Sequence, residues 1–171
     1  ICCNFKEIDK EDSYFEPYSV VSYGDVDVAY IGITTPHTIS SSSPTQFRDE
    51  NGEPLYTFSS TNLYDVVQEN IDLAKKAGAE YVIALSHIGY ADDAIYGDLE
   101  DVETLIRNTK GFDVVLDAHS HTVIEEKIIV DEGGNEVVLS STGTKFENIG
   151  KLVISNGKFD TQLIKTVDYE K

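Results

Sequence analysis

The sequence predicts an α/β fold whose parallel strands come first and whose antiparallel hairpins follow at the C-terminal end. Two strongly apolar runs, residues 81–85 and 112–116, each come after a segment with helical periodicity. This order is typical of buried strands in a parallel sheet. Beyond residue 121, short β-rich segments are joined by Gly-Gly-Asn and Asn-Gly turns, which are typical of hairpins. Because the chain has 171 residues and 40% hydrophobic content, we expect one compact unit with a sizeable core.

The N-terminal residues predict a strand. The chain opens on Ile1-Cys2-Cys3-Asn4-Phe5, an apolar run that looks like a strand entered partway, and the sequence contains no methionine. We therefore expect that a preceding part of the same domain lies outside this sequence. The two cysteines are adjacent, so they cannot form the spaced bridges of a disulfide scaffold. We interpret them as small buried residues of an inner strand, with a vicinal disulfide or a thiol site as the alternatives.

A hairpin and a long loop follow. Residues 18–22 and 26–33 are β-rich, and Tyr23-Gly24-Asp25 between them predicts the turn. Residues 37–58 are rich in serine, proline and Asn-Gly, which predicts a loop that carries a small hairpin at residues 49–52. Loops of this kind often line functional sites.

Two helices separate the predicted parallel strands. The first repeats apolar residues at helical spacing from Val66 to Ala77, with Thr61 or Asn62 as its N-cap and Gly78 as its stop. The second is shorter: after an acidic loop at residues 91–98, it places Val102, Leu105 and Ile106 on one face and ends before Gly111. The later strands are expected at residues 124–130, 136–141, 151–155 and 158–164.

Charge and hydropathy exclude two classes of partner. The chain has 31 acidic and 13 basic residues and a formal charge of −18, so binding to a DNA or RNA polymer would meet repulsion. No apolar stretch approaches the ~20 residues that a membrane span needs, and no signal-peptide pattern is present.

Three of the four histidines stand just past the predicted parallel strands. His87 follows the first strand, and His119 and His121 follow the second, two residues apart. Ligands of parallel sheets sit where strands end, and alternate side chains of an extended segment point the same way. Because neutral imidazole is a common ligand of transition metals, we predict a metal site formed by these three residues. His37, in a loop beside Pro36, is interpreted as a structural residue.

Other polar residues carry weaker hypotheses. Asp117 is either a partner that orients an imidazole or a polar residue that ends a strand. Asp92 and Asp93 are interpreted as part of a solvated loop in preference to hard-cation ligands. Lys145 and Asn148 could contact a phosphate, although a turn that leads to an edge strand is the favoured interpretation. No phosphate-cradling glycine loop or nucleophile elbow is present.

In this order, five segments resemble the calcineurin-like metallophosphatase domain of the bacterial 5′-nucleotidase and 2′,3′-cyclic-nucleotide phosphodiesterase family. They are Asn4-Phe5, residues 32–36 (GITTP), residues 74–79 (AKKAGA) running into residues 86–89 (SHIG), residues 117–122 (DAHSHT) and residues 141–145 (STGTK). The similarity covers nearly the whole chain, and the histidine pair resembles the Gly-His-x-His motif of that superfamily. The sequence departs from it at Ala118, where the family usually has glycine.

The resemblance implies the fold, the cofactors and the activity. The fold would be part of a metallophosphatase β-sandwich flanked by helices, and residues 1–171 would form the C-terminal portion of that domain. His87 and His119 would bind one of two divalent ions, zinc, manganese or iron, and His121 would bind the other. The parent protein would hydrolyse nucleotide phosphate esters by metal-activated water, outside the cytoplasm or at the cell surface.

The resemblance also implies what this sequence lacks. The family's Asp-x-His, bridging aspartate and Gly-Asn-His segments would precede Ile1, and its nucleotide-binding domain would follow Lys171. No leaving-group acid can then be assigned here, and we expect the isolated chain to bind little or no metal and to be inactive. A non-catalytic binding or scaffold module with vestigial ligands is the main alternative. A mononuclear metal hydrolase is a further one, although no carboxylate is clearly placed as its base.

Overall fold

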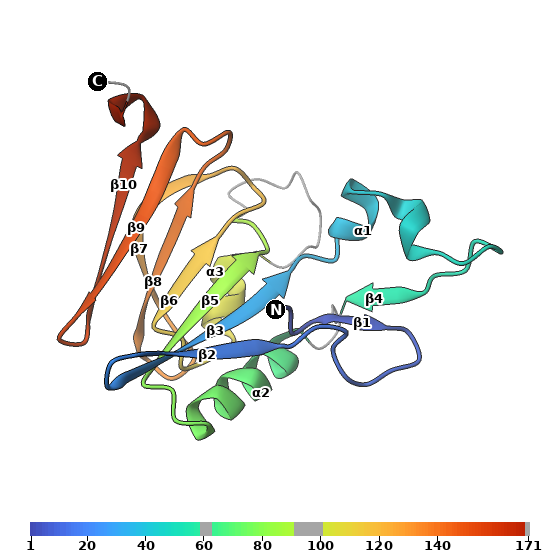
Figure 1. Ribbon diagram of the computed structural model, residues 1–171, viewed down its shortest axis with the longest axis horizontal. Helices are drawn as coiled ribbons and strands as arrows, with labels where there is room; N and C mark the ends of the chain where they lie inside the picture. Colours follow the sequence, from blue (N-terminus) through green and yellow to red (C-terminus); the bar gives the residue numbers. More distant parts are fainter. Residues whose placement is uncertain (59–62, 91–100, 170–171) are drawn as a thin grey trace.

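The computed structural model describes residues 1–58, 63–90 and 101–169, and its centre is a sheet of six strands (Figure 1). The strand order is β2-β3-β5-β6-β8-β7. The bounds of these strands are Tyr18–Tyr23 for β2, Val26–Thr34 for β3, Tyr81–His87 for β5, Val114–Asp117 for β6, Val123–Val130 for β7 and Glu136–Thr142 for β8.

The predicted parallel strands are confirmed. β3 pairs with β5, β5 with β6 and β6 with β8, all in parallel, while β2 and β7 close the two edges as antiparallel strands. The β2–β3 hairpin also forms as predicted, with Gly24 at a φ of 67° in its turn. Because the central strands are parallel, they all end at the same edge of the sheet. Their last residues are Thr34, His87, Asp117 and Thr142.

Two helices cover one face of the sheet. They are α2, Leu63–Lys76, and α3, Val102–Arg107. The buried face of α2 includes Val67, Ile71 and Ala74, as its 3.6-residue spacing predicts, and it packs against alternate residues of β3 such as Ala29 and Ile31. Asp101 caps α3 by accepting a hydrogen bond from the Thr104 N–H at 2.9 Å. The predicted N-caps of α2, Thr61 and Asn62, and the acidic loop with Asp92 and Asp93 lie outside the described residues.

A two-stranded sheet lies over the opposite face. It pairs β9, Asn148–Ser155, with β10, Lys158–Lys165, in antiparallel order, and a short 3-10 turn, η3, covers Thr166–Tyr169. Apolar residues of the hairpin contact a second core cluster on the main sheet. That cluster contains Val28, Ile83, Val114 and Val138, and Leu152, Ile154 and Phe159 pack against it. In the described residues, this layer of the expected sandwich consists of these two strands alone.

The expected N-terminal strand is wrong in its position. Residues 1–4 are not in a strand, and the short β1, Phe5–Glu7, pairs instead with β4, Tyr56–Phe58. Both cysteines are nevertheless buried, as predicted, and they are free thiols. Ile1 crosses β3 so closely that a Cβ added at Gly32 would lie 2.3 Å from the Ile1 carbonyl oxygen. The conformation of residues 1–4 is therefore determined by contact with the β3 backbone. Strand propensity does not predict such a contact.

The segment predicted as a long loop contains more structure than expected. It includes α1, Thr38–Ser41, a 3-10 turn η1, Pro44–Phe47, and β4. The small hairpin predicted at residues 49–52 forms as one antiparallel bridge between Arg48 and Pro54. Short elements of this kind depend on tertiary contacts, here a cluster of aromatic rings around Phe5, so serine and proline content alone does not reveal them.

Among the described residues, no helix has the length and apolar character that crossing a bilayer requires.

Candidate functional site

Two of the predicted metal ligands meet at the carboxyl edge of the parallel strands. His87 is the last residue of β5, and His119 lies two residues beyond the end of β6. The Nε2 atom of His87 and the Nδ1 atom of His119 are 3.2 Å apart, and their ring centroids are 5.0 Å apart. The structure thus brings together, from neighbouring strands, two imidazoles that are 32 residues apart in the sequence.

His37, interpreted from the sequence as a structural loop residue, joins this pair. Its Nδ1 atom lies 3.3 Å from the Nε2 atom of His119, so the two nitrogens of the His119 ring face two different histidines. The Thr35 N–H donates to the His87 carbonyl oxygen at 3.1 Å, which places the segment after β3 beside the end of β5. The parallel pairing of Thr34 with His87 could have indicated this proximity, because His37 follows Thr34 by three residues.

His121 is nearby but does not share these contacts. It is exposed, and its charge is one of the influences on His119. Burial lowers the pKa of His119, and positive charge on His87, His37 and His121 lowers it further. The lowered pKa favours the neutral form of His119, which is the form of imidazole that binds metals.

The backbone around the histidines is unusual. His119 has a φ of 81° and His121 a φ of 59°, in the left-handed region that costs a non-glycine residue about 1–2 kcal/mol. Strained residues of this kind cluster at functional sites. Ala118, the position where the sequence departs from the family motif, is not among the described residues with positive φ, so its Cβ causes no strain of that type.

Gly89 allows His119 to approach. It has a φ of 99°, and a Cβ added there would lie 3.3 Å from Cδ2 of His119. The position therefore requires glycine both for its backbone angle and for space.

Asp117 holds the loop that follows His87. Its buried carboxylate accepts hydrogen bonds from the N–H of Ile88 at 3.1 Å and the N–H of Gly89 at 3.1 Å. Burial raises the pKa of this carboxyl, while the neighbouring Ser86 hydroxyl and the backbone N–H groups oppose the rise. The carboxylate fixes the loop between His87 and Gly89 through its backbone, so Asp117 supports the site through this loop.

Hydroxyl groups fasten the loop that carries His119 and His121. The Ser120 hydroxyl accepts the Tyr90 N–H at 3.0 Å and contacts the Thr122 hydroxyl at 2.9 Å. The Ser141 hydroxyl donates to the Thr122 carbonyl oxygen at 2.8 Å. The loop after β6 is thereby attached both to the loop after β5 and to β8.

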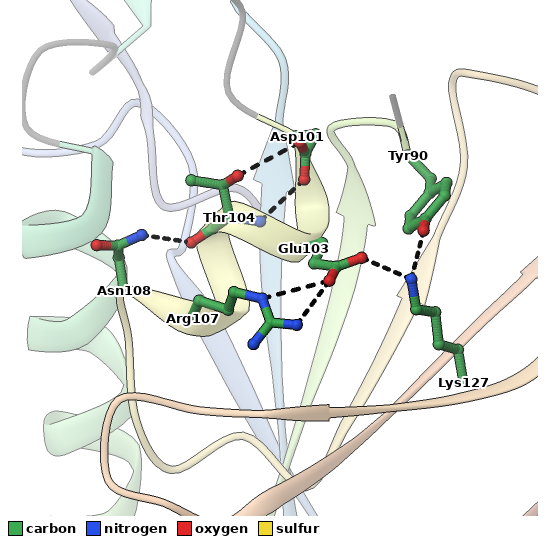
Figure 2. Close-up of polar contacts among 7 residues, drawn as sticks. All are labelled: Tyr90, Asp101, Glu103, Thr104, Arg107, Asn108 and Lys127. Atoms are coloured by element: carbon green, nitrogen blue, oxygen red, sulfur yellow. Dashed lines mark hydrogen bonds and ion pairs between the residues drawn. The ribbon is translucent and has the colours of Figure 1, made fainter. Parts of the chain in front are cut away.

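Tyr90 is itself anchored by a charged network (Figure 2). The ammonium group of Lys127, on β7, donates to the Tyr90 hydroxyl and lies 2.6 Å from Glu103 on α3. Arg107 contacts the other oxygen of Glu103 at 2.7 Å. Lys127 and Arg107 hold the pKa of Glu103 at about 2, well below its ordinary value. This network ties α3 and β7 to the residue that follows Gly89.

The geometry of one pair fits a shared metal ion. Two nitrogen ligands at zinc-like distances on a tetrahedral ion are about 3.4 Å apart, close to the 3.2 Å between His87 and His119. In the part of the chain that the structure describes, however, no group of three or more His, Cys, Asp or Glu side chains is arranged around one ion position. The distance is thus compatible with a pair of ligands on one ion, and such an ion would need further ligands to complete its coordination.

Asn148 and Lys145 lie at a turn that leads into a strand, which was the favoured interpretation of these two residues. Asn148 begins β9, and its amide donates to the Thr142 carbonyl oxygen at 3.0 Å, as a residue that closes a turn does. Lys145, with a φ of 56°, lies in that turn and is exposed. Asp92 and Asp93 lie outside the described residues.

Comparison with known sequences finds relatives that are phosphoesterases by name. The chain is 29% identical over 114 residues to the snake venom 5′-nucleotidase of Crotalus adamanteus, a match that covers 65% of this chain and 16% of that protein. It is 28% identical over 124 residues to the trifunctional nucleotide phosphoesterase protein YfkN of Bacillus subtilis, with 72% and 7% covered. The chain thus spans about a sixth of the venom protein's length. No family model matches.

Comparison with solved structures gives the same fold. The calcineurin-like phosphoesterase YfkN from Bacillus subtilis superposes with a TM-score of 0.72 at 19% identity, covering 99% of this chain and 56% of that one. A 5′-nucleotidase precursor from Thermus thermophilus gives 0.69 at 21% identity, covering 96% and 33%. The chain is therefore homologous to 5′-nucleotidases and to a calcineurin-like phosphoesterase, and the resemblance found in its sequence is confirmed.

Proposed function

We propose that this chain is part of a two-metal phosphoesterase that hydrolyses phosphate esters of nucleotides. The observation that carries the proposal is the 3.2 Å approach of His87 Nε2 to His119 Nδ1 at the carboxyl edge of the parallel strands, where these two nitrogens can share one ion. Relatives named as 5′-nucleotidases and as a nucleotide phosphoesterase support the reaction class.

Each histidine has a separate role in this proposal. His87 and His119 hold one divalent ion, and His121 contributes to the second. If Nδ1 of His119 binds the ion, its Nε2 carries the hydrogen and donates to Nδ1 of His37, 3.3 Å away. His37 is then a positioning residue that fixes the ring and its tautomer. Divalent ions held there would offset the negative charge of a phosphate ester and would lower the pKa of water toward ~7.

We also propose that the rest of the active site comes from a further part of the same domain. The face of the sheet opposite α2 and α3 is only partly covered by β9 and β10, and a hollow of about 620 Å³ remains there. Its walls include Tyr30, Tyr81, Ile83, Leu116, Leu152 and Ile154. An additional layer packed on this apolar face would complete the sandwich and bring the missing carboxylate ligands to the site.

Phosphate release tests the proposal. A longer polypeptide that restores the preceding half of the domain should hydrolyse a nucleoside monophosphate or a 2′,3′-cyclic nucleotide when manganese or zinc is added, and His119→Ala should abolish this activity. The 171-residue chain alone should be inactive, because one ion would keep only two protein ligands and the other only one. Lys158→Ala, at an exposed position at the start of β10, is the control and should retain activity.

Two results would contradict the proposal. Robust turnover by the isolated chain would refute the division of the site between two segments. A folded, metal-loaded longer protein that hydrolyses no phosphoester would favour a binding or scaffold module.

A further inference from the structure

The pairing of β7 with β8 contains a β-bulge that determines where Lys127 points. Ile124 lies opposite Ser141. The next pair is Lys127 with Leu139, so three residue steps of β7 match two steps of β8. In a regular strand, residues three apart point to opposite faces of the sheet. The extra residue therefore returns the Lys127 side chain to the face that Ile124 and Leu139 share, the face that α3 covers.

The second layer of the fold holds this bulge in place. The hydroxyl of Thr161, a buried residue of β10, donates to the Glu125 carbonyl oxygen at 2.7 Å. The Leu163 N–H, also on β10, donates to the Glu125 carboxylate at 3.1 Å. Bulges re-aim side chains and are frequent next to active sites. Because β10 fixes the bulged residue, the direction of Lys127 is set by two layers of the structure.

From Lys127, a series of contacts leads to the histidine pair. The ammonium group donates to the Tyr90 hydroxyl and lies 2.6 Å from Glu103 (Figure 2). The Tyr90 N–H donates to the Ser120 hydroxyl at 3.0 Å, and Ser120 directly follows His119. The bulge in β7 is therefore connected, residue by residue, to the loop that carries His119.

The contacts of Lys127 exceed those of an ordinary ion pair between β7 and α3. Glu103 already has Arg107 at 2.7 Å, and exposed ion pairs contribute little to stability. What distinguishes Lys127 from Arg107 is its hydrogen bond to the Tyr90 hydroxyl. This contact requires the bulge, because a regular strand would turn the lysine to the other face.

We propose that Lys127 is a positioning residue for the histidine pair. By holding Tyr90, it fixes the Ser120 hydroxyl. Ser120 in turn sets the place of the His119 ring, whose Nδ1 atom lies 3.2 Å from Nε2 of His87. The proposal rests on the proposed function, which makes these two rings ligands of one ion, but its test observes the rings in the absence of metal.

Proton NMR of the metal-free chain tests this proposal. Ring signals and nuclear Overhauser contacts report how the imidazoles of His87 and His119 lie relative to each other, and their centroids are 5.0 Å apart. Lys127→Met keeps the length of the side chain and removes its charge and its donors. This change should shift the ring signals of both histidines and weaken or remove the Overhauser contacts between them. Tyr90→Phe, which removes only the hydroxyl, should have the same effect.

Two further variants separate positioning from general stability. Lys127→Arg should restore the wild-type ring signals, because arginine also donates N–H groups to two acceptors. Arg107→Met is the matched control: it removes the other cation of Glu103 and leaves the Tyr90 hydroxyl bonded to Lys127. Its ring signals should be those of the wild type.

A merely structural role would change stability without moving the rings. If Lys127→Met lowers the free energy of unfolding but leaves the ring signals and Overhauser contacts of the folded chain unchanged, the proposal is wrong. Equal shifts in Arg107→Met would also overturn it, because they would come from a displacement of α3. Should Lys127→Met fail to fold, Tyr90→Phe decides by the same measurement. The assay contains neither metal nor substrate, so failure here leaves the proposed hydrolysis standing, and failure of hydrolysis leaves the role of Lys127 standing.

Discussion

Replacing Asp117 with alanine should loosen the loop that carries His87 and destabilise the whole fold. The Asp117 carboxylate, 6% exposed, is the acceptor for the N–H groups of Ile88 and Gly89. In the alanine variant, both buried N–H donors lose this acceptor. A buried donor that loses its partner costs about 1–3 kcal/mol, so two cost about 2–4 kcal/mol once water entry offsets part of the loss.

The asparagine variant separates the hydrogen bonds from the charge. Asp117→Asn keeps one oxygen as an acceptor and removes the negative charge. Burial already disfavours that charge, because it raises the pKa of the carboxyl group. Its cost should therefore be about half that of alanine, about 1–2 kcal/mol. Urea unfolding followed by tyrosine fluorescence measures the free energy of unfolding, since the chain has ten tyrosines and no tryptophan.

A surface carboxylate provides the control. Asp25, exposed in the β2–β3 turn, should change the free energy of unfolding by no more than about 0.5 kcal/mol when replaced with alanine. If Asp117→Ala is equally mild, Asp117 does not hold the loop, and our account of how the fold positions His87 fails.

Three further changes test other parts of the structure. Gly89→Ala should lower the free energy of unfolding by about 1–2 kcal/mol, because φ is 99°, and should shift the NMR signals of the His119 ring, which the new Cβ would approach to 3.3 Å. Gly32→Ala should displace Ile1 and Cys2 from β3, since its Cβ would lie 2.3 Å from the Ile1 carbonyl oxygen, and faster hydrogen exchange at the N–H of Cys2 and Cys3 would report this. Glu103 has its pKa lowered to about 2, so its stabilising effect is present above its ordinary value of 4.5 and is lost as the pH falls toward 2. At 1.36 kcal/mol per pKa unit, this shift would correspond to about 3 kcal/mol of stability. Solvent screening reduces the contribution to about 1 kcal/mol. The unfolding curves of the wild type and Glu103→Gln should therefore differ at pH 7 and coincide at pH 2.

Much of the fold follows from periodicity. The alternation of strands with helices of 3.6-residue spacing predicts β5, α3 and β6 because each must bury one face or both faces. The Gly-Gly-Asn and Asn-Gly turns predict the β7–β8 and β9–β10 hairpins because few residues other than Gly and Asn accept positive φ, as Asn156 and Gly134 do.

Other parts could not be predicted because they depend on contacts between distant segments. Cys2 and Cys3 are buried, but the N–H of Cys3 donates to the Gly32 carbonyl oxygen in place of a regular strand ladder. β4 exists because Phe58 pairs with Phe5, 53 residues earlier. Neither contact leaves a local pattern in the sequence.

The candidate site shows the same division. Strand ends predict that His87 and His119 meet, because parallel strands finish at one edge of the sheet. His37 lies in a loop, and only the turn after β3 brings it to His119. The left-handed backbone at His119 and His121 could not be predicted either, since only a small fraction of non-glycine residues adopt it.

Paramagnetic broadening of NMR signals by manganese tests the central claim most directly, because it detects weak binding in the isolated chain. Low concentrations of Mn²⁺ should broaden the ring signals of His87 and His119 together, and His87→Ala or His119→Ala should remove the effect at the remaining partner. Zinc should compete for the same position. Broadening confined to acidic surface residues, with both imidazoles unaffected, would contradict the claim that these histidines share one ion.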